Sequence, residues 1–446
     1  MSQTPFDKAF KRLSSLTNYE KAPVTRNYRF DLHKMEALLA KLGNPEKKLA
    51  CVVQVGGSKG KGTVSCMTGA LAASTGAKVG VYLSPHVRDV RERILLHGEP
   101  ASAEALVPHL HRVASHFIEG QTWFEAFTAV ALSFFAEQDL DLVVLEVGLG
   151  GRLDSTTVVP KQACCLTTIE REHTQTLGDR IEEITREKAG ILRPGIPCIS
   201  GLTGVAWDVL QKEAQKAGAP LVPLTKEFQC TILDQGTWGM RLTHPLLGKE
   251  PWELPIHTRT QARSLALALL LFREIAPEKT PDLQPKALAD ALRLFHPPGR
   301  FQILELADGR TVLLDGAHTN ASLEALGKDL ASVFGNKPRD PGQTRNLQAP
   351  PFDLVFAIAD TKQWQEGLGS IAPFVDKAIG VPLREKRSQA PQKMAEWFAK
   401  REIPFEALDS VENAIRKILL SSPDRGILVT GSFYGVGEAL EVLEEN

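Results

Sequence analysis

The chain has 446 residues, enough for two or three domains, with 43% hydrophobic and 24% charged residues, as in globular proteins. Lys and Arg (52) nearly cancel Asp and Glu (53), so the net charge gives no attraction for nucleic acid or for an anionic membrane. No apolar run reaches membrane-spanning length, and the N-terminal segment has no signal-peptide core. The cysteines contain no CxxC pair. We therefore expect a cytoplasmic protein with reduced thiols and no nucleic-acid or membrane partner.

The first informative segment covers residues 51–63, where an apolar run leads into a Gly-rich turn. The helical spacing of Val64, Met67 and Leu71 predicts a helix directly after the turn. A strand, a glycine loop and a helix form a phosphate cradle when backbone N–H groups point inward and a lysine, here Lys61, neutralises phosphate oxygens. The segment therefore predicts phosphate binding.

The strict phosphate-loop pattern fails at two positions of this segment. It requires glycine where the chain has Val55, and Ser or Thr where the chain has Gly62, with Thr63 one step later. The competing interpretation is an ordinary glycine turn between a strand and a helix. The strand–loop–helix context favours the phosphate cradle, and Thr63 offers a hydroxyl to Mg²⁺.

Apolar runs and helical patterns alternate along the first part of the chain. Buried parallel strands are predicted at 51–55, 79–83, 142–147, 164–169 and 196–200. This alternation is typical of an α/β domain with a parallel sheet. Shorter alternating runs in residues 222–255 predict a β excursion within the same domain.

A linker is predicted at Pro297-Pro298-Gly299, because the strand–helix rhythm restarts after it. The strands expected beyond the linker are 311–314, 353–359, 377–381 and 426–430. Residues 335–351 carry four prolines and are expected to form a mobile surface loop. We therefore predict an α/β protein in which a P-loop parallel-sheet domain (1–297) precedes a smaller Rossmann-like α/β domain (298–446).

Polar residues follow several predicted strands, at the sheet edge where ligands bind in parallel sheets. Glu146 ends the apolar run 142–147, and a buried carboxylate is costly unless it meets a cation. It is either a Mg²⁺ ligand opposite the phosphate loop or the ion-pair partner of Arg152. Ser84 follows the strand 79–83 and is a weak metal donor signal when taken alone.

His173 and Lys188 each allow two interpretations from their surroundings. His173 follows the strand 164–169, so it either binds a divalent ion or faces a transferred phosphoryl group, or it is an ordinary loop histidine. Lys188 lies near the C-terminal end of a helix. On residue chemistry alone it is a solvated charge favoured by the helix dipole.

The second domain has its own set of polar residues at predicted strand ends. Arg300 follows the linker, Asp315 and His318 follow the strand 311–314, and Asp360 and Ser432 follow two later strands. If the two rims face each other, a nucleotide would lie in the cleft between the domains.

Together these segments resemble the folylpolyglutamate synthase/dihydrofolate synthase family of the Mur ligase superfamily. The resemblance runs from about Leu38 to Val436. The blocks that carry it are Leu42-Gly43-Asn44-Pro45, Ser84-Pro85-His86, Arg91-Glu92-Arg93-Ile94, Glu146 to Asp154, Lys188-Ala189-Gly190-Ile191, Pro298-Gly299-Arg300-Phe301-Gln302 and Asp315-Gly316-Ala317-His318.

The resemblance implies three groups of site residues. Lys61, His173 and Lys188 would be catalytic, and Mg²⁺ would lie on Ser84, Glu146, His173 and, if carbamylated, Lys188. The implied ATP contacts are Gly57, Ser58, Lys59, Gly60, Gly62, Thr63, Gln261, Arg300, Asp315 and His318. The implied pterin or folate contacts are Thr122, Trp123, Phe124, Glu125, Leu153, Asp154 and Ser155.

The resemblance also implies roles for the two domains, a P-loop ATPase domain followed by a ligase domain, and it implies an activity. The protein would be an ATP-dependent ligase that joins L-glutamate to dihydropteroate or a reduced folate through an acyl phosphate. ATP and two Mg²⁺ ions would be its cofactors, with a monovalent cation as a further candidate. A monomer in the cytoplasm is the family expectation.

Several residues depart from the family pattern at the expected site. They are Ser58 and Lys59 in the phosphate loop, Glu172 before the histidine, and Thr157, Ala262 and Thr319 at three other positions. The alternatives are a ligase for a non-folate acid, a non-catalytic paralogue that binds nucleotide or folate, and a generic P-loop NTPase. Retention of Lys61, Lys188 and the metal set favours an active ligase.

Overall fold

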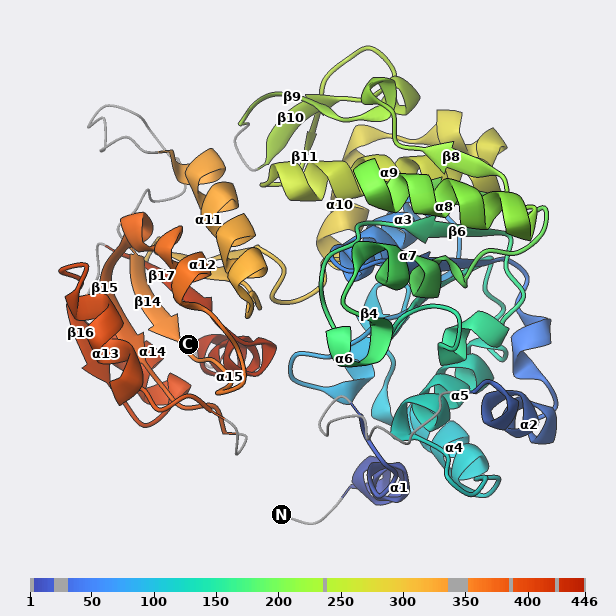
Figure 1. Ribbon diagram of the computed structural model, residues 1–446, viewed down its shortest axis with the longest axis horizontal. Coiled ribbons are helices and arrows are strands. Elements are labelled where there is room, and N and C mark those ends of the chain that lie inside the picture. Colours follow the sequence, from blue (N-terminus) through green and yellow to red (C-terminus); the bar gives the residue numbers. More distant parts are fainter. Residues whose placement is uncertain are drawn as a thin grey trace.

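The structure is a computed structural model that describes residues 4–19, 31–235, 239–335, 352–384, 388–421 and 425–444. Two α/β lobes lie next to each other, the larger one blue to yellow and the smaller one orange to red (Figure 1). Most of the loop predicted at 335–351 lies outside the described residues. Within the described part of the chain, no helix is both long enough and apolar enough to cross a membrane.

The larger lobe is built on a sheet with the strand order β4-β3-β2-β5-β1-β6-β7-β8. Its parallel centre runs from β2 to β8, and β3 and β4 extend one edge in antiparallel pairing. The strands are β1 (Val52–Gly56), β2 (Val79–Tyr82), β3 (Ile94–Leu96), β4 (Glu99–Pro100), β5 (Leu142–Glu146), β6 (Ala163–Leu166), β7 (Cys198–Ser200) and β8 (Leu221–Pro223).

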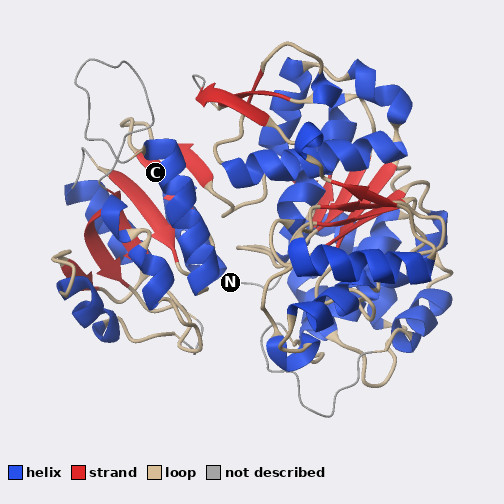
Figure 2. Cartoon of the chain, turned by 45° about the horizontal axis from the view of Figure 1, so that its top comes forward, coloured by secondary structure: helices blue, strands red, loops and turns tan. Residues whose placement is uncertain are grey.

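Helices cover both faces of this sheet, as Figure 2 shows. Val53 and Val55 pack in the cluster with α3 (Lys61–Ser74), α9 (Arg259–Ile275) and α10 (Pro285–Leu294), whereas Val52 packs on the other face with α5 (Trp123–Phe135). Alternate residues of a strand point to opposite faces, so β1 contributes to both cores. The remaining helices of this lobe are α1 (Pro5–Ser14), α2 (His33–Lys41), α4 (Ala103–Ala114), α6 (Thr174–Leu177), α7 (Ile181–Ala189) and α8 (Gly204–Ala217).

The β excursion is confirmed as a separate antiparallel sheet above α9 and α10 (Figure 1). It consists of β9 (Thr231–Gln235), β10 (Met240–Thr243) and β11 (Trp252–Leu254). The excursion begins later than the predicted residue 222, because β8 (Leu221–Pro223) joins the main sheet instead. Met240, Leu242 and Leu254 are buried against the α9 side of the core.

The smaller lobe has the strand order β12-β13-β17-β14-β15-β16, with only the β12–β13 pairing antiparallel. The strands are β12 (Gln302–Glu305), β13 (Thr311–Leu314), β14 (Phe352–Phe356), β15 (Val375–Gly380), β16 (Phe405–Ala407) and β17 (Gly426–Thr430). The helices α11 (Asn320–Phe334), α12 (Gln365–Gly369) and α13 (Gln392–Ala399) cover one face, and α14 (Val411–Ser421) and α15 (Phe433–Glu444) cover the other. The predicted α/β fold is confirmed.

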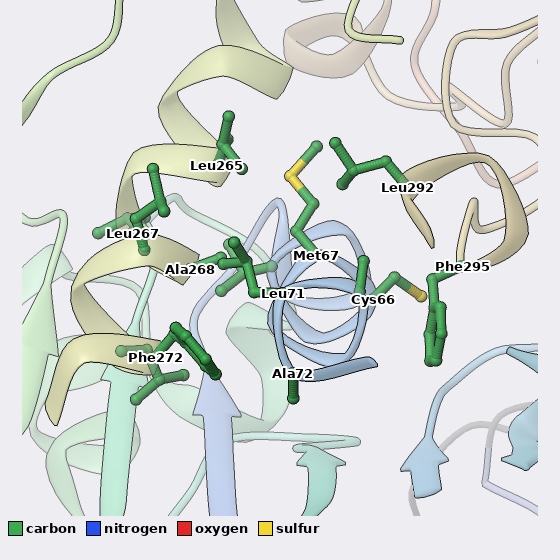
Figure 3. Close-up of a cluster of buried hydrophobic side chains, with 14 of the residues drawn as sticks. Cys66, Met67, Leu71, Ala72, Leu265, Leu267, Ala268, Phe272, Leu292 and Phe295 are labelled. Atoms are coloured by element: carbon green, nitrogen blue, oxygen red, sulfur yellow. The ribbon is translucent and has the colours of Figure 1, made fainter. Parts of the chain in front are cut away.

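Helix α3 is almost entirely buried, which fixes the position of the glycine loop before it. In Figure 3, Met67 and Leu71 of α3 face Leu265 and Ala268 of α9, while Phe295 lies beside Cys66. Gly69 lets the helix approach both the sheet and the end of α10 closely, because a Cβ there would lie 3.0 Å from Val81 of β2 and 2.9 Å from the Phe295 ring. The core therefore holds the N-terminal end of α3 rigidly at the sheet edge.

Leu71→Ala is expected to lower the free energy of unfolding by about 2–5 kcal/mol, because Leu71 is fully buried and alanine leaves a cavity. Urea unfolding followed by circular dichroism measures the change. Val205→Ala on α8 is the control, since that side chain is 54% exposed and its loss should cost less than about 0.5 kcal/mol. Equal losses in the two variants would contradict the packing described for α3.

Candidate active site

The glycine loop between β1 and α3 lies tightly against the chain that follows β6. Gly57 has a φ of 134°, and a Cβ there would collide with the Thr167 hydroxyl and lie 3.1 Å from the Thr168 nitrogen. Only glycine fits this close approach. The loop therefore presents backbone rather than side chain at the end of the strand, as phosphate binding requires.

Hydroxyl groups from the β6 side hold the loop in place. Thr167 Oγ1 donates to the Lys59 carbonyl oxygen at 2.6 Å, and the Lys59 N–H donates to Thr168 Oγ1 at 2.9 Å. The buried Ser58 Oγ accepts the Glu170 N–H at 3.0 Å. The strand was predicted to continue through 164–169, but it ends at Leu166, because these hydroxyls bond the loop instead of facing a core.

Lys188 is buried under the glycine loop, with a side chain that is 2% exposed. Its Nζ donates to the Gly57 carbonyl oxygen at 2.8 Å and lies 3.3 Å from Glu172 Oε1. The residue-level prediction of a solvated charge at a helix end is therefore wrong. The carbonyl and the carboxylate together replace the water that this ammonium group loses on burial.

Glu172 lies between two lysines that are far from it in sequence. Its Oε2 is 3.7 Å from Lys59 Nζ, while its Oε1 faces Lys188. Burial alone would raise the pKa of Glu172, but Lys188, Lys61 and Lys59 lower it to about 2. Burial and Lys61 in turn lower the pKa of Lys188 to about 8. Sequence reasoning noted Glu172 only as a departure from a pattern and missed this pairing.

Glu146 ends β5 beside the glycine loop and is 2% exposed. Its Oε2 accepts the Ser84 N–H at 2.8 Å, and burial raises its pKa against the opposing effect of Lys61. The alternative partner Arg152 is excluded, because its Nη2 pairs with Glu187 Oε1 at 2.8 Å. Glu146 and Ser84 are thus adjacent, as the sequence predicts.

These oxygen donors suit a divalent cation. Among the described residues, no three His, Cys, Asp or Glu side chains form a ready-made metal cage. Mg²⁺ often takes only one or two carboxylates and completes its shell with water and substrate phosphates. Glu146 and Ser84, next to a phosphate loop, fit that pattern.

His173 lies at the N-terminal end of α6 with a φ of 50°. Burial lowers the pKa of His173 and so favours the neutral imidazole, although Glu172 opposes the shift. A neutral imidazole can ligate a metal or accept a proton. Its neighbours Glu172 and Lys188 place it at the same edge as the glycine loop.

The smaller lobe contributes a cation, Arg300, and the polar residues His318 and Asp315. The Arg300 guanidinium lies 4.2 Å from the Phe433 ring centroid, and its charge acts on Glu146 of the larger lobe. His318 Nδ1 donates to the Gly316 carbonyl oxygen at 2.7 Å, and burial lowers its pKa to about 4. Asp315 instead accepts two backbone N–H groups, those of Phe301 and Ala317, each at 2.8 Å.

Gln261, predicted as a nucleotide contact, bonds two backbone groups through its side-chain amide. Its Oε1 accepts the His257 N–H at 2.8 Å, and its Nε2 donates to the Arg300 carbonyl oxygen at 3.2 Å. Both ends of the amide are occupied, so Gln261 joins the start of α9 to the linker. Together with Thr63 and Arg300 it lines a small cavity of about 10 Å³.

The two segments predicted for the pterin site lie side by side. The Phe124 ring packs directly over Gly148, and Asp154 Oδ2 accepts the Gly148 N–H at 3.0 Å. Thr122 and Glu125 form a capping box at the start of α5, and Trp123 is buried. In these two segments Phe124 and Leu153 are partly exposed, whereas Thr122, Trp123, Glu125, Asp154 and Ser155 are buried.

Comparison with known proteins identifies the family. A family model described as Mur ligase, glutamate ligase domain, matches residues 299–433. A Bacillus subtilis protein named dihydrofolate synthase/folylpolyglutamate synthase is 33% identical over 68% of this chain and 73% of its own length. The chain belongs to the folylpolyglutamate synthase/dihydrofolate synthase family. It spans about half (49% and 51%) of the length of two further curated relatives.

Solved structures of this family have the same two-lobed fold. Escherichia coli FolC in complex with DHPP and ADP aligns over 100% of this chain and 99% of its own, with a TM-score of 0.80 and 27% identity. A Yersinia pestis bifunctional folylpolyglutamate synthase/dihydrofolate synthase complexed with AMPPNP and Mn ion aligns over 100% of both chains, with a TM-score of 0.78 and 25% identity.

The departures from the family pattern are packed into structural contacts of this chain. Thr157 Oγ1 donates to the Gly151 carbonyl oxygen at 2.7 Å and accepts the Gln54 amide at 2.9 Å. Thr319 caps α11, and Ala262 is buried inside α9. Lys59 and Glu172 differ from these, because they pair with each other across the candidate site.

Glu172→Gln is expected to lower the free energy of unfolding at pH 7, since it leaves Lys188 buried without a carboxylate. The pKa of Glu172 falls on folding from 4.5 to about 2. Its contribution, on the order of 3 kcal/mol, is therefore complete above pH 4.5 and disappears as the pH falls towards 2. Urea unfolding as a function of pH should show the deficit of the variant shrinking below pH 4.5.

The matched control is Glu187→Gln, which removes the more exposed carboxylate paired with Arg152. That variant should lose less than about 1 kcal/mol, because exposed ion pairs contribute little. A Glu172→Gln deficit that stays constant with pH would contradict the pairing.

Proposed function

We propose that this chain is an ATP-dependent ligase that joins L-glutamate to the carboxylate of dihydropteroate or a reduced folate through an acyl phosphate. The observation that carries the proposal is the convergence of charge at one edge of the first sheet. Lys61, Lys188 and Lys59 surround the glycine loop, Glu146 lies beside it, and Arg300 approaches from the other lobe. The ligands of FolC, DHPP and ADP, support the same conclusion.

The chain's own residues suit phosphoryl transfer from ATP to a carboxylate. The glycine-loop N–H groups and the N-terminus of α3 would hold the phosphates, and Lys61 would neutralise the charge that develops on the transferred group. Lys61 Nζ donates to the Ser58 carbonyl oxygen at 3.1 Å, so the ammonium group already lies over the loop. The carboxylate oxygen attacks the γ-phosphorus and ADP leaves.

The second step would form the amide. The amine of L-glutamate attacks the acyl carbon and inorganic phosphate leaves. Arg300, stacked on Phe433, and His318 would hold the nucleotide and phosphate from the smaller lobe, which also keeps water away from the acyl phosphate. We propose that residues 1–297 and 298–446 act as the two domains that enclose this reaction.

Ser84, Glu146 and His173 would hold divalent cations, which supply charge neutralisation for the phosphates. The manganese in the Yersinia pestis structure supports this choice. Carbamylation of Lys188 stays a prediction. A monovalent cation, a monomeric state and a cytoplasmic location also stay predictions. The free state of all the cysteines supports a reducing compartment.

A non-folate acid is the second candidate acceptor. The observation that favours it is the burial of Trp123, Glu125 and Asp154. Glu125 caps a helix and Asp154 bonds a loop backbone, so few of the predicted pterin contacts are exposed to a ligand. Phe124 and Leu153 would then contribute most of the acceptor contact from these two segments.

Mass spectrometry of products from dihydropteroate and from tetrahydrofolate, each with ATP and L-glutamate, tests the function. We expect a product one glutamyl unit heavier, together with stoichiometric ADP and phosphate. Lys61→Met should lower kcat about 10²- to 10³-fold, because it removes charge stabilisation at the transferred phosphoryl group. ATP turnover without any glutamylated product, or no turnover with either acceptor, would contradict the proposal.

Lys59→Asn is expected to raise the KM for ATP about tenfold while kcat changes less, because Lys59 adds a positive charge beside the phosphates. Lys59→Arg keeps the charge and is the matched control. Steady-state kinetics at several salt concentrations should show a weaker salt dependence of KM for the asparagine variant. An unchanged KM at low salt would mean that Lys59 serves only as the partner of Glu172.

A further inference from the structure

Helix α15 of the smaller lobe contacts the loop that follows β2 in the larger lobe. A Cβ at Gly437 would lie 2.5 Å from the Val87 carbonyl oxygen and 3.1 Å from the Val87 carbonyl carbon. Figure 1 shows α15 on the side of its lobe that faces the larger one. Because any side chain at position 437 would meet backbone atoms, the contact requires glycine.

Val87 is buried in the core of the other lobe. Its side chain is 6% exposed and belongs to the apolar cluster that contains Val312, Leu314 and Val436. Two turns further along α15, Glu444 Oε2 pairs with Arg88 Nη1 at 2.6 Å. Positions 437 and 444 lie on one face of the helix, so a single face of α15 contacts this loop.

The same loop is rigid within itself. The Glu92 carboxylate accepts the N–H groups of Val87 at 2.7 Å, Arg88 at 3.2 Å and Asp89 at 3.1 Å. A few residues earlier the Ser84 N–H donates to Glu146 Oε2 at 2.8 Å. A continuous set of contacts therefore leads from α15 through Val87 to the Ser84–Glu146 pair.

The beginning of α15 positions the smaller lobe's own site residues. Phe433 lies under the Arg300 guanidinium and 5.9 Å from the His318 ring. One helix thus supports Arg300 and His318 at its N-terminal end and the Ser84 loop at Gly437. A shift of α15 would move both sides of the candidate site relative to Glu146.

We propose that Val87 and Gly437 are positioning residues that fix Ser84 against Glu146 by docking the loop after β2 onto α15. The Ser84–Glu146 pair is correctly placed only when the two lobes are docked at this contact. The proposal rests on the proposed function in one respect, namely that Ser84 and Glu146 hold a divalent cation. Val87 and Gly437 themselves touch neither substrate nor metal in this account.

Gly437→Ala and Gly435→Ala form a matched pair that tests the proposal. The second substitution lies on the same helix, but a Cβ at Gly435 faces Ala357 and Leu383 within the smaller lobe. Gly437→Ala should increase amide hydrogen exchange of Ser84 and Val87 about tenfold, and Gly435→Ala should leave it unchanged. Val87→Ala should act in the same direction as Gly437→Ala, and it replaces that variant if Gly437→Ala does not fold.

Calorimetric titration of Mn²⁺ in the presence of ADP supplies the second readout. We expect Gly437→Ala and Val87→Ala to bind Mn²⁺ about tenfold more weakly, which is the usual effect of losing support for a metal ligand. Glu444→Gln should change the Mn²⁺ affinity little, because the ion pair between Glu444 and Arg88 is exposed. Unchanged exchange, or faster exchange with unchanged Mn²⁺ affinity, would overturn the proposal.

The two proposals fail in different ways. Weaker Mn²⁺ binding by Gly437→Ala in a protein that ligates no glutamate would support this inference and contradict the ligase function. Normal Mn²⁺ binding by a folded Gly437→Ala variant in an active ligase would contradict this inference alone.

Discussion

The pairing of Glu172 with Lys188 and Lys59 is the interaction on which the candidate site depends. Three lysines and an arginine come together around a glycine loop that is largely shielded from water. Without Glu172, the repulsion between Lys188, Lys61 and Lys59 would oppose folding of this edge of the sheet. Glu172 lets the site keep a surplus of positive charge beside the loop, which is what a polyphosphate requires.

The candidate site takes its charged and polar residues from both lobes. Lys61, Lys188 and Glu146 come from the larger lobe, whereas Arg300 and His318 come from the smaller one. Gln261 holds the backbone of Arg300 across the linker, and α15 holds both Phe433 and the loop that contains Ser84. The chemistry assigned to the chain is thus a property of the docked pair of lobes.

Local patterns were enough to predict the fold and the residues at strand ends. The apolar run before Gly57 and the helical spacing after it define β1 and α3, and parallel strands bring Ser84, Glu146 and His173 to one edge. Contacts between distant parts of the chain were not predictable in this way. Glu172 meets Lys59 and Gln261 meets Arg300 only after folding, and the burial of Lys188 depends on the Gly57 carbonyl. No periodicity or spacing in the sequence indicates which distant residues will pair.

The central claim is that this edge of the sheet activates a carboxylate by phosphorylation. The most direct measurement uses an acceptor whose carboxylate carries ¹⁸O, followed by mass spectrometry of the released phosphate. If the carboxylate is phosphorylated, one ¹⁸O atom moves from it to inorganic phosphate in every turnover that forms an amide. Phosphate that carries no label from the acceptor would contradict it.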